Sequence, residues 1–347
     1  MDKTVKFRVE IESNGQKVLH SVTASTEELR KAIGDIPDVA QRATSSLSNM
    51  GSFALALNSS IEVVGRLQDV ISGIAQDFNA FDKGMRAVNT MAGESKEGLS
   101  LLTGQVEELA NTIPLAKEEL ASGLYQVISN GVPKDNWIAF LEQSSKSAVG
   151  GIADLGQTVT VTSTLIKNYG LEWSEAAALQ DKIQTTAKNG VTSFEQLAQA
   201  LPRVTGNAAT LGVTVDELMA SFATLTGVSG NTNEVSTQMA AIFTALVKPS
   251  SEATEMAQAM GIQFDAAAIK AAGGFQNFLT NLDGTVKAYA AANGMIAEEI
   301  YGKLFGSAEA LRALIPLNGE LADTYRNNVS AMADSGGTID AAFESMS

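Results

Sequence analysis

The first stretch of the chain alternates between apolar and charged side chains. Residues 4–12 read TVKFRVEIE, and Asn14-Gly15 then supplies the pair that favours a type I′ turn before the chain returns through QKVLHSV. This pattern predicts a β-hairpin with one apolar face. Two strands alone are marginally stable in water, so we expect the face to be covered by a helix, another copy or a partner. We therefore interpret residues 1–35, with a short helix after the hairpin, as a docking arm. The apolar positions of its first strand are Val5, Phe7, Val9 and Ile11.

A long helical pattern follows in residues 36–95. Its apolar positions are spaced three and four apart, which predicts a coiled-coil-like seam of about six heptads. Serine and asparagine stand beside the seam in place of complementary charges, so the number of partner helices stays open. An amphipathic helix that packs on its own domain is the alternative. The seam contains Leu57, Ile61, Val64, Ile71 and Phe78, and it continues through Met85 and Val88.

Shorter helices, separated by glycines about twenty residues apart, are predicted for residues 96–347. An apolar residue follows each glycine, as expected where glycine ends a helix in the left-handed conformation and the next side chain folds back on the last turn. The chain is therefore predicted to be mainly α, with a bundle of short helical hairpins in this region. The predicted joints are Gly131, Gly151, Gly170, Gly190 and Gly212, followed by Val132, Ile152, Leu171, Val191 and Val213.

The stretch LGVTVDELMASFATLTG, residues 211–227, contains two adjacent acids, Asp216 and Glu217. They could form a reactive carboxylate pair or belong to a joint between helices. Thr214-x-x-Glu217 matches a capping box, in which the acid bonds to the backbone at the start of a helix, and Thr192-x-x-Glu195 matches the same pattern. A recurring joint is therefore the better interpretation, with Glu217 bonded to backbone.

Charge and residue content exclude several functions. Lys and Arg number 24 against 39 Asp and Glu, and this net charge of −15 has the wrong sign for direct nucleic-acid binding. The chain has no cysteine, and its one histidine, His20, cannot form a histidine metal pair. Adjacent acids such as Glu298-Glu299 point about 100° apart on a helix. We therefore expect no enzyme, cofactor or metal site, and membrane contact only through segments not present here.

Several stretches from residue 81 onward resemble the core region of phage tail tape measure proteins. These are FDKGMRAVNTMAGES (81–95), LANTIPLAKEELASGLYQVISNGV (109–132), NGVTSFEQLAQALPRVTGNAATLGVTVDELMASFATL (189–225) and LFGSAEALRAL (304–314). The resemblance covers roughly residues 80–320 in the same order. Because several motifs occur in sequence, it is more specific than any single motif of the chain.

The resemblance implies a non-enzymatic structural protein in the tail tube lumen of a long-tailed phage or phage-like particle. Such a protein sets tail length during assembly in the bacterial host cytoplasm and is released at DNA ejection. The implied partners are further copies of itself, the tail tube protein, tail assembly chaperones, and baseplate or tail-tip proteins. Members are usually much longer than 347 residues, so we expect an N-terminal portion truncated at its C-terminus, with most of the ruler beyond it.

Two other classes of protein remain as alternatives. A helical pore-forming or injected effector would share the acidic, cysteine-free and amphipathic character of the chain. A cryptic peptidoglycan hydrolase is the enzyme alternative, and it is disfavoured by the single histidine and the unpaired carboxylates.

Overall fold

The computed structural model describes residues 4–13, 16–25 and 80–346, and most of them are helical. The mainly α fold predicted from the sequence is thereby confirmed. The chain divides into two compact units, Met1–Lys83 and Gly84–Ser347. The predicted coiled-coil seam at Leu57, Ile61, Val64, Ile71 and Phe78 lies outside the described residues.

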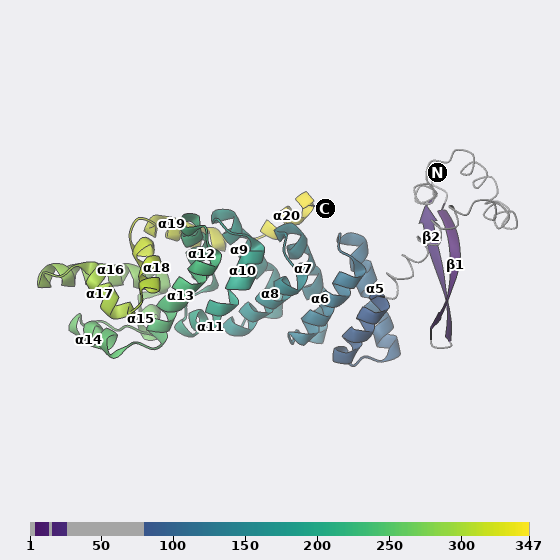
Figure 1. The fold of residues 1–347 in the computed structure, drawn as a ribbon, viewed down its shortest axis with the longest axis horizontal. Helices are drawn as coiled ribbons and strands as arrows, with labels where there is room; N and C mark the ends of the chain where they lie inside the picture. Colours follow the sequence, from purple (N-terminus) through teal and green to yellow (C-terminus); the bar gives the residue numbers. More distant parts are fainter. Residues whose placement is uncertain (1–3, 14–15, 26–79, 347) are drawn as a thin grey trace. The chain divides into compact units, whose positions relative to one another are not determined.

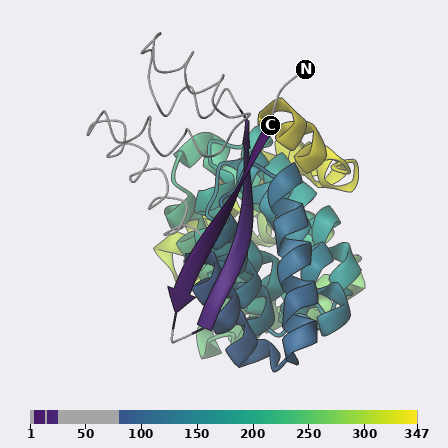
Figure 2. The same cartoon turned by 90° about the vertical axis from the view of Figure 1, so that its right-hand side faces the viewer.

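The described part of the first unit is a two-stranded antiparallel ribbon. Strand β1, Thr4–Ser13, pairs with β2, Gln16–Ser25, and Figure 2 shows the twist of the pair. The register places Phe7 opposite Val22 and Val9 opposite His20.

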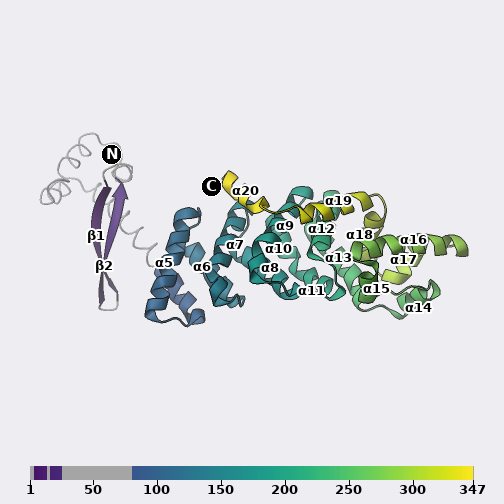
Figure 3. The ribbon, with the colours of Figure 1, turned by 180° about the vertical axis from the view of Figure 1, so that it is seen from behind.

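Most of the second unit consists of helical hairpins in two layers. In the first layer, α7 contacts α9 and α9 contacts α12; in the second, α6, α8, the α10–α11 pair and α13 follow one another (Figures 1 and 3). The first-layer helices are α7 (Trp137–Gly151), α9 (Ala176–Asn189) and α12 (Val215–Ser229). The second-layer helices are α6 (Lys117–Ser129), α8 (Leu155–Tyr169), α10 (Phe194–Ala200), α11 (Pro202–Leu211) and α13 (Thr232–Val247).

Local sequence explains where these helices begin and which face they bury. Asp154 caps α8 by accepting a hydrogen bond from the backbone N–H of Gln157 at 2.8 Å, and Asn231 caps α13 in the same way. The apolar stripes of the two layers face each other and form the core. Side chains without solvent exposure include Leu165, Ile183, Leu218, Phe222 and Ile242. Short 3₁₀ turns, Lys134–Asn136 and Trp173–Glu175, precede α7 and α9.

The chain enters this unit through a helix at residues 80–92, followed by α5 (Lys96–Thr112). Met85 and Val88, two positions of the predicted seam, are buried here. The same helix approaches α6 so closely that a Cβ added at Gly84 would lie 3.1 Å from the Cβ of Ala121. At this end of the seam, the helix packs on its own chain.

Beyond α13, five helices close the far end of the stack. They are α14 (Ser251–Ala259), α15 (Ala266–Ala272), α16 (Phe275–Asn293), α17 (Ala297–Phe305) and α18 (Ala308–Asn318). Aromatic contacts hold them together: the ring of Phe264 packs edge-on against Phe305 with centroids 5.0 Å apart. Phe275 makes a similar contact, at 5.6 Å, with Phe243 of α13.

The last two helices turn back along the first layer. We call α19 (Ala322–Ala333) and α20 (Thr338–Met346) together the return strap. Helix α19 contacts α12 and α9, and α20 contacts α9 and α7, so the strap runs against the direction of the stack (Figures 1 and 3). Its hydrogen bonds to α9 and α12 join residues more than a hundred positions apart in the sequence.

Candidate functional site

Three joints lead from the second layer into the first, and we call this side of the stack the glycine edge. Gly131, Gly170 and Gly212 have φ angles of 74°, 63° and 75°, the left-handed conformation that the glycine-apolar pattern favours. The next backbone N–H in each joint donates to a carbonyl five residues earlier, as Leu171 does to Ile166 at 2.9 Å. Val213 is 1% exposed, so its side chain folds back into the core.

The joints leading out of the first layer are built differently, and the left-handed conformation predicted for Gly151 and Gly190 is wrong. Gly151 is the last residue of α7, and Gly190 has an extended backbone with φ of −108°. Close packing is the reason. A Cβ added at Gly151 would lie 2.9 Å from Phe194, and one added at Gly190 would overlap Thr226 Oγ1.

Because Gly151 is used for packing, the left-handed position moves to Ile152, which has φ of 50°. The helix still ends with a hydrogen bond from the N–H of Ala153 to the carbonyl of Ala148, at 2.9 Å. The side chains of Ile152 and Val191, predicted to fold back, are instead 72% and 59% exposed. At the third joint of this side, Val228 precedes the left-handed Gly230 and is 69% exposed. We call Ile152, Val191 and Val228 the aliphatic edge.

The capping box predicted at Thr192 is also wrong by one residue. Ser193 is the N-cap of α10, and its hydroxyl accepts a hydrogen bond from the N–H of Gln196 at 3.2 Å. Thr192 Oγ1 instead lies 2.6 Å from Thr232 Oγ1 at the start of α13. The residue therefore connects two neighbouring joints.

Glu217 is a buried carboxylate that joins three segments. The predicted capping box is confirmed: Oε2 accepts a hydrogen bond from the N–H of Thr214 at 3.0 Å, and Thr214 Oγ1 accepts one from the N–H of Glu217. The other oxygen, Oε1, accepts from the N–H of Gln276 in the first turn of α16, at 3.0 Å. Its backbone carbonyl accepts from Tyr325 Oη of the return strap at 3.3 Å. The neighbouring Asp216 makes an ion pair with Lys182 at 2.6 Å. These two acids therefore have separate structural partners.

Helix α9 connects the layers to the strap through polar side chains that sequence reasoning missed. Asp181 is 7% exposed, and its two oxygens accept hydrogen bonds from the backbone N–H groups of Gly337 and Ile339 at 2.9 and 2.8 Å. It thereby caps α20 from another helix. Lys182 Nζ donates to the carbonyl of Met332 near the end of α19, at 2.8 Å. No local pattern could have revealed contacts that join residues about 150 positions apart.

Gln180 completes this polar cluster on the side facing α7 and α8. Its Oε1 accepts from Ser147 Oγ at 2.6 Å, and its Nε2 donates to Ser144 Oγ and Thr162 Oγ1. All four side chains are fully buried. A buried polar group whose hydrogen bonds are satisfied fixes the relative position of its neighbours, so this cluster sets how the first hairpins meet.

Two tyrosines lie close to Glu217. Burial, and to a lesser degree the Glu217 charge, raises the pKa of the Tyr169 hydroxyl above its usual value. Burial likewise raises the pKa of Tyr325. Tyr169 Oη is buried without a hydrogen-bond partner. A phenol with a raised pKa stays protonated at neutral pH and cannot serve there as a base.

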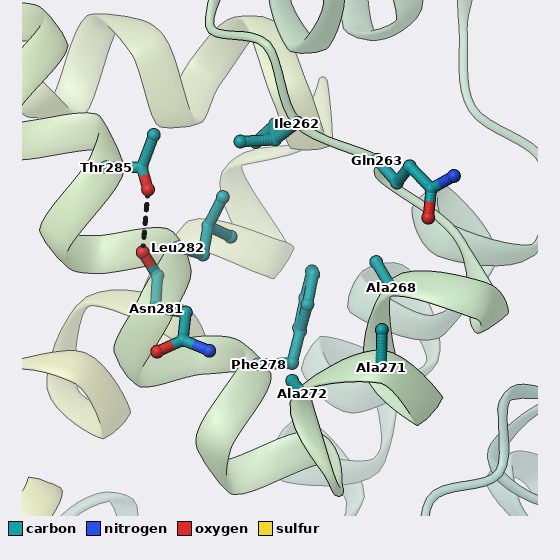
Figure 4. Close-up of a pocket in the computed structure, with 9 residues that line it drawn as sticks. All are labelled: Ile262, Gln263, Ala268, Ala271, Ala272, Phe278, Asn281, Leu282 and Thr285. Carbon is teal, nitrogen blue, oxygen red and sulfur yellow. Dashed lines mark hydrogen bonds between the residues drawn. The ribbon is translucent and has the colours of Figure 1, made fainter.

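Two pockets lie in the second unit. One of about 290 Å³ lies between α15 and α16, where the Phe278 ring faces the alanines of α15 (Figure 4). Its lining contains no charged side chain. Its residues are Ile262, Gln263, Ala268, Ala271, Ala272, Phe278, Asn281, Leu282 and Thr285. A second pocket, of about 420 Å³, lies beside Leu101 and Trp137 and carries the Lys134–Glu94 ion pair.

The part of the chain that the structure describes contains no group of three or more His, Asp or Glu residues placed to hold a metal ion. None of its helices is both long enough and apolar enough to cross a membrane.

The four apolar positions of the predicted docking arm, Val5, Phe7, Val9 and Ile11, occupy alternate positions of β1.

The structure brings together the glycine joints, because Gly131, Gly170 and Gly212 lie at successive turns into the first layer. These joints support the fold, whereas the side chains of the aliphatic edge are exposed.

Comparison with known proteins identifies the family. Residues 103–306, more than half of the chain, match the model for phage-related minor tail proteins. The chain is 25% identical to a probable tape measure protein of Clostridium phage phiCD119 over 96% of its own length and 37% of that protein. It is 21% identical to the tape measure protein of Pneumococcus phage Dp-1 over 54% of its length and 16% of that protein. No solved structure matches. The chain therefore belongs to the family of phage-related minor tail proteins.

Proposed function

We propose that this chain is part of a tape measure protein and acts as a non-enzymatic structural component of a phage tail. The observation that carries the proposal is the family match over residues 103–306, which coincides with the hairpin stack. Two relatives, both named as tape measure proteins, support it. The chain spans about two fifths or less of these relatives, so the activity of the whole protein is part of the proposal.

Within such a protein, we assign residues 84–347 to assembly or docking and not to length measurement. As one continuous helix they would extend roughly 400 Å at 1.5 Å per residue. The hairpin joints fold the chain back instead, so residue number and distance are no longer proportional. We therefore place most of the ruler in parts of the full-length protein outside these residues.

The proposed location is the lumen of the tail tube, with release at DNA ejection. The proposed partners are the tail tube protein, tail assembly chaperones, and baseplate or tail-tip proteins. Self-association is assigned to the segment 38–92, through positions before residue 80, because Met85 and Val88 are buried within this chain. The hairpin face of Val5 and Phe7 is assigned to docking. Replacing Leu57 and Ile61 with Asp should lower the oligomeric mass in light scattering. An unchanged mass would show that this helix packs only on its own chain.

The assignment is tested by two deletions in the full-length protein. Removing residues 189–228 deletes α10, α11 and most of α12 together with Glu217, so we expect absent or disordered tails. An in-frame deletion of equal length in a later uninterrupted helical stretch should shorten tails in proportion. Electron micrographs showing uniform, slightly shorter tails after the first deletion would make this region part of the ruler.

Dye leakage from liposomes, or clearing of peptidoglycan, caused by residues 84–347 would replace the structural role with a pore-forming or hydrolytic one.

A further inference from the structure

The three residues of the aliphatic edge belong to joints that are linked to one another by packing and hydrogen bonding. Ile152 follows Gly151, which packs on Phe194 of the next joint. Val191 lies between Gly190, which packs on Thr226, and Thr192, whose hydroxyl lies 2.6 Å from that of Thr232. Val228 lies in the sequence between Thr226 and Thr232, the two residues that make these contacts. Three exposed aliphatic side chains therefore come from three successive joints, whereas exposed apolar residues on a surface are usually scattered singly.

The Ile152 side chain is costly to the isolated fold in two ways. A β-branched residue is disfavoured in the left-handed conformation, where glycine or asparagine fits without strain. Its side chain also remains 72% exposed, so burial does not compensate for the strain. Among the described residues, Ile152 is the only non-glycine with a positive φ angle. The packing of Gly151 on Phe194 explains the conformation at residue 152, but it does not explain why an exposed isoleucine stands there, and this choice of residue points to a role for the side chain.

The charges around this edge indicate the chemistry of a partner. Within the three joints and the helix turns that flank them, the charged residues are Asp154, Lys188, Glu195 and Glu234. These three acids and one base give the edge a net negative charge. Asp154 and Glu195 are solvent-exposed, and the whole chain carries a net charge of −15.

We propose that the aliphatic edge binds a protein segment that presents aliphatic side chains flanked by lysine or arginine. Nucleic acid and anionic lipid have the same sign of charge as the edge. A second copy docking through its own edge would also bring acids together. A basic, amphipathic protein segment satisfies both the apolar row and the surrounding acids.

An amphipathic Lys/Leu peptide and a matching Glu/Leu peptide are suitable probes for residues 1–347. Fluorescence anisotropy should show binding of the Lys/Leu peptide, weakened at least about tenfold in an Ile152→Asn, Val191→Thr, Val228→Thr variant. The matched control changes three exposed aliphatic residues elsewhere: Leu101→Gln, Val247→Thr and Ile296→Thr. Its affinity should stay within about twofold of the original.

Several outcomes would overturn the proposal. They are absence of Lys/Leu peptide binding, equal loss in the control variant, or equal binding of the Glu/Leu peptide. If the edge variant instead dissociates an oligomer that forms without peptide, the occupant is a second copy.

Stability provides an independent readout of the same edge. Because asparagine tolerates the left-handed conformation, Ile152→Asn alone should raise the melting temperature by about 2–4 °C while weakening peptide binding. A variant that loses stability and binding together would show that Ile152 serves only the fold.

Discussion

The two edges of the hairpin stack contain the same sequence pattern, a glycine followed by an aliphatic residue, but they use the glycine differently. On the glycine edge, Gly170 and Gly212 provide positive φ angles, and Val213 is returned to the core. On the aliphatic edge, Gly151 and Gly190 provide room for a neighbouring helix, and the following side chains remain exposed. Where the glycine provides a positive φ angle, the local sequence also determines that the next side chain packs in the core. Where the glycine provides space for a neighbouring helix, contacts with distant residues determine whether the next side chain is buried or exposed.

The largest effect is expected where the glycine edge is tied to distant helices. Glu217→Ala removes charge-assisted hydrogen bonds to the backbone of both Thr214 and Gln276, so the free energy of unfolding should fall by about 3 kcal/mol. Asp216→Ala removes one ion pair near the surface and should cost at most about 1 kcal/mol. Urea denaturation of both variants measures the difference. Equal losses would mean that the link to α16 contributes nothing.

Packing on the aliphatic edge should give the next largest effect. Gly190→Ala introduces a Cβ that overlaps Thr226 Oγ1 and lies 3.0 Å from the backbone oxygen of Ala223, so we expect a loss of about 2–3 kcal/mol. Combining it with Thr226→Ala should recover part of that loss beyond the sum of the single effects, as measured by a double-mutant cycle. Strict additivity would show that this contact is not what fixes Gly190.

A pH dependence should follow the tyrosines near Glu217. Their hydroxyls have raised pKa values in the folded state, so at high pH the unfolded chain loses protons that the folded chain retains. Stability should therefore be unaffected below about pH 10 and fall above it, by about 1.4 kcal/mol per pH unit for each tyrosine. Urea denaturation at several alkaline pH values should show a shallower slope for the Tyr169→Phe, Tyr325→Phe double variant. An unchanged slope would assign the loss to other groups.

The smallest effects separate conformation from space. A Cβ at Gly170 would meet no atom within 4 Å, so Gly170→Ala should cost only the left-handed conformation, about 1 kcal/mol. Gly206 also has open space around it but lies inside α11 without a positive φ angle. Gly206→Ala should therefore stabilise the chain by about 0.5–1 kcal/mol. Melting temperatures that move in the same direction for both variants would contradict this distinction.

Local patterns were sufficient for part of this architecture. The glycine-apolar pair at Gly212 and the box from Thr214 to Glu217 each involve residues a few positions apart, so their geometry can be predicted from the sequence. The packing of Gly190 on Thr226 depends on a helix more than thirty residues away. The same limit applies to Asp181, whose partners in the return strap are more than 150 residues away. The exposure of Ile152 was missed for this reason as well, because it depends on Phe194 approaching Gly151.

The return strap also determines when this unit can finish folding during synthesis. Ribosomes add about 5–20 residues per second, so Asp181 is made about 8–30 s before Gly337. The N–H of Gly337 donates a hydrogen bond to Asp181 in the folded chain. During that interval the first-layer helices α7, α9 and α12 exist without the helices that cover them. Water hydrates Asp181 and Lys182 during this time, so the uncovered face of these helices is less prone to non-specific association than an apolar face would be. We therefore expect this face to tolerate exposure to water until the last helices of the unit are made.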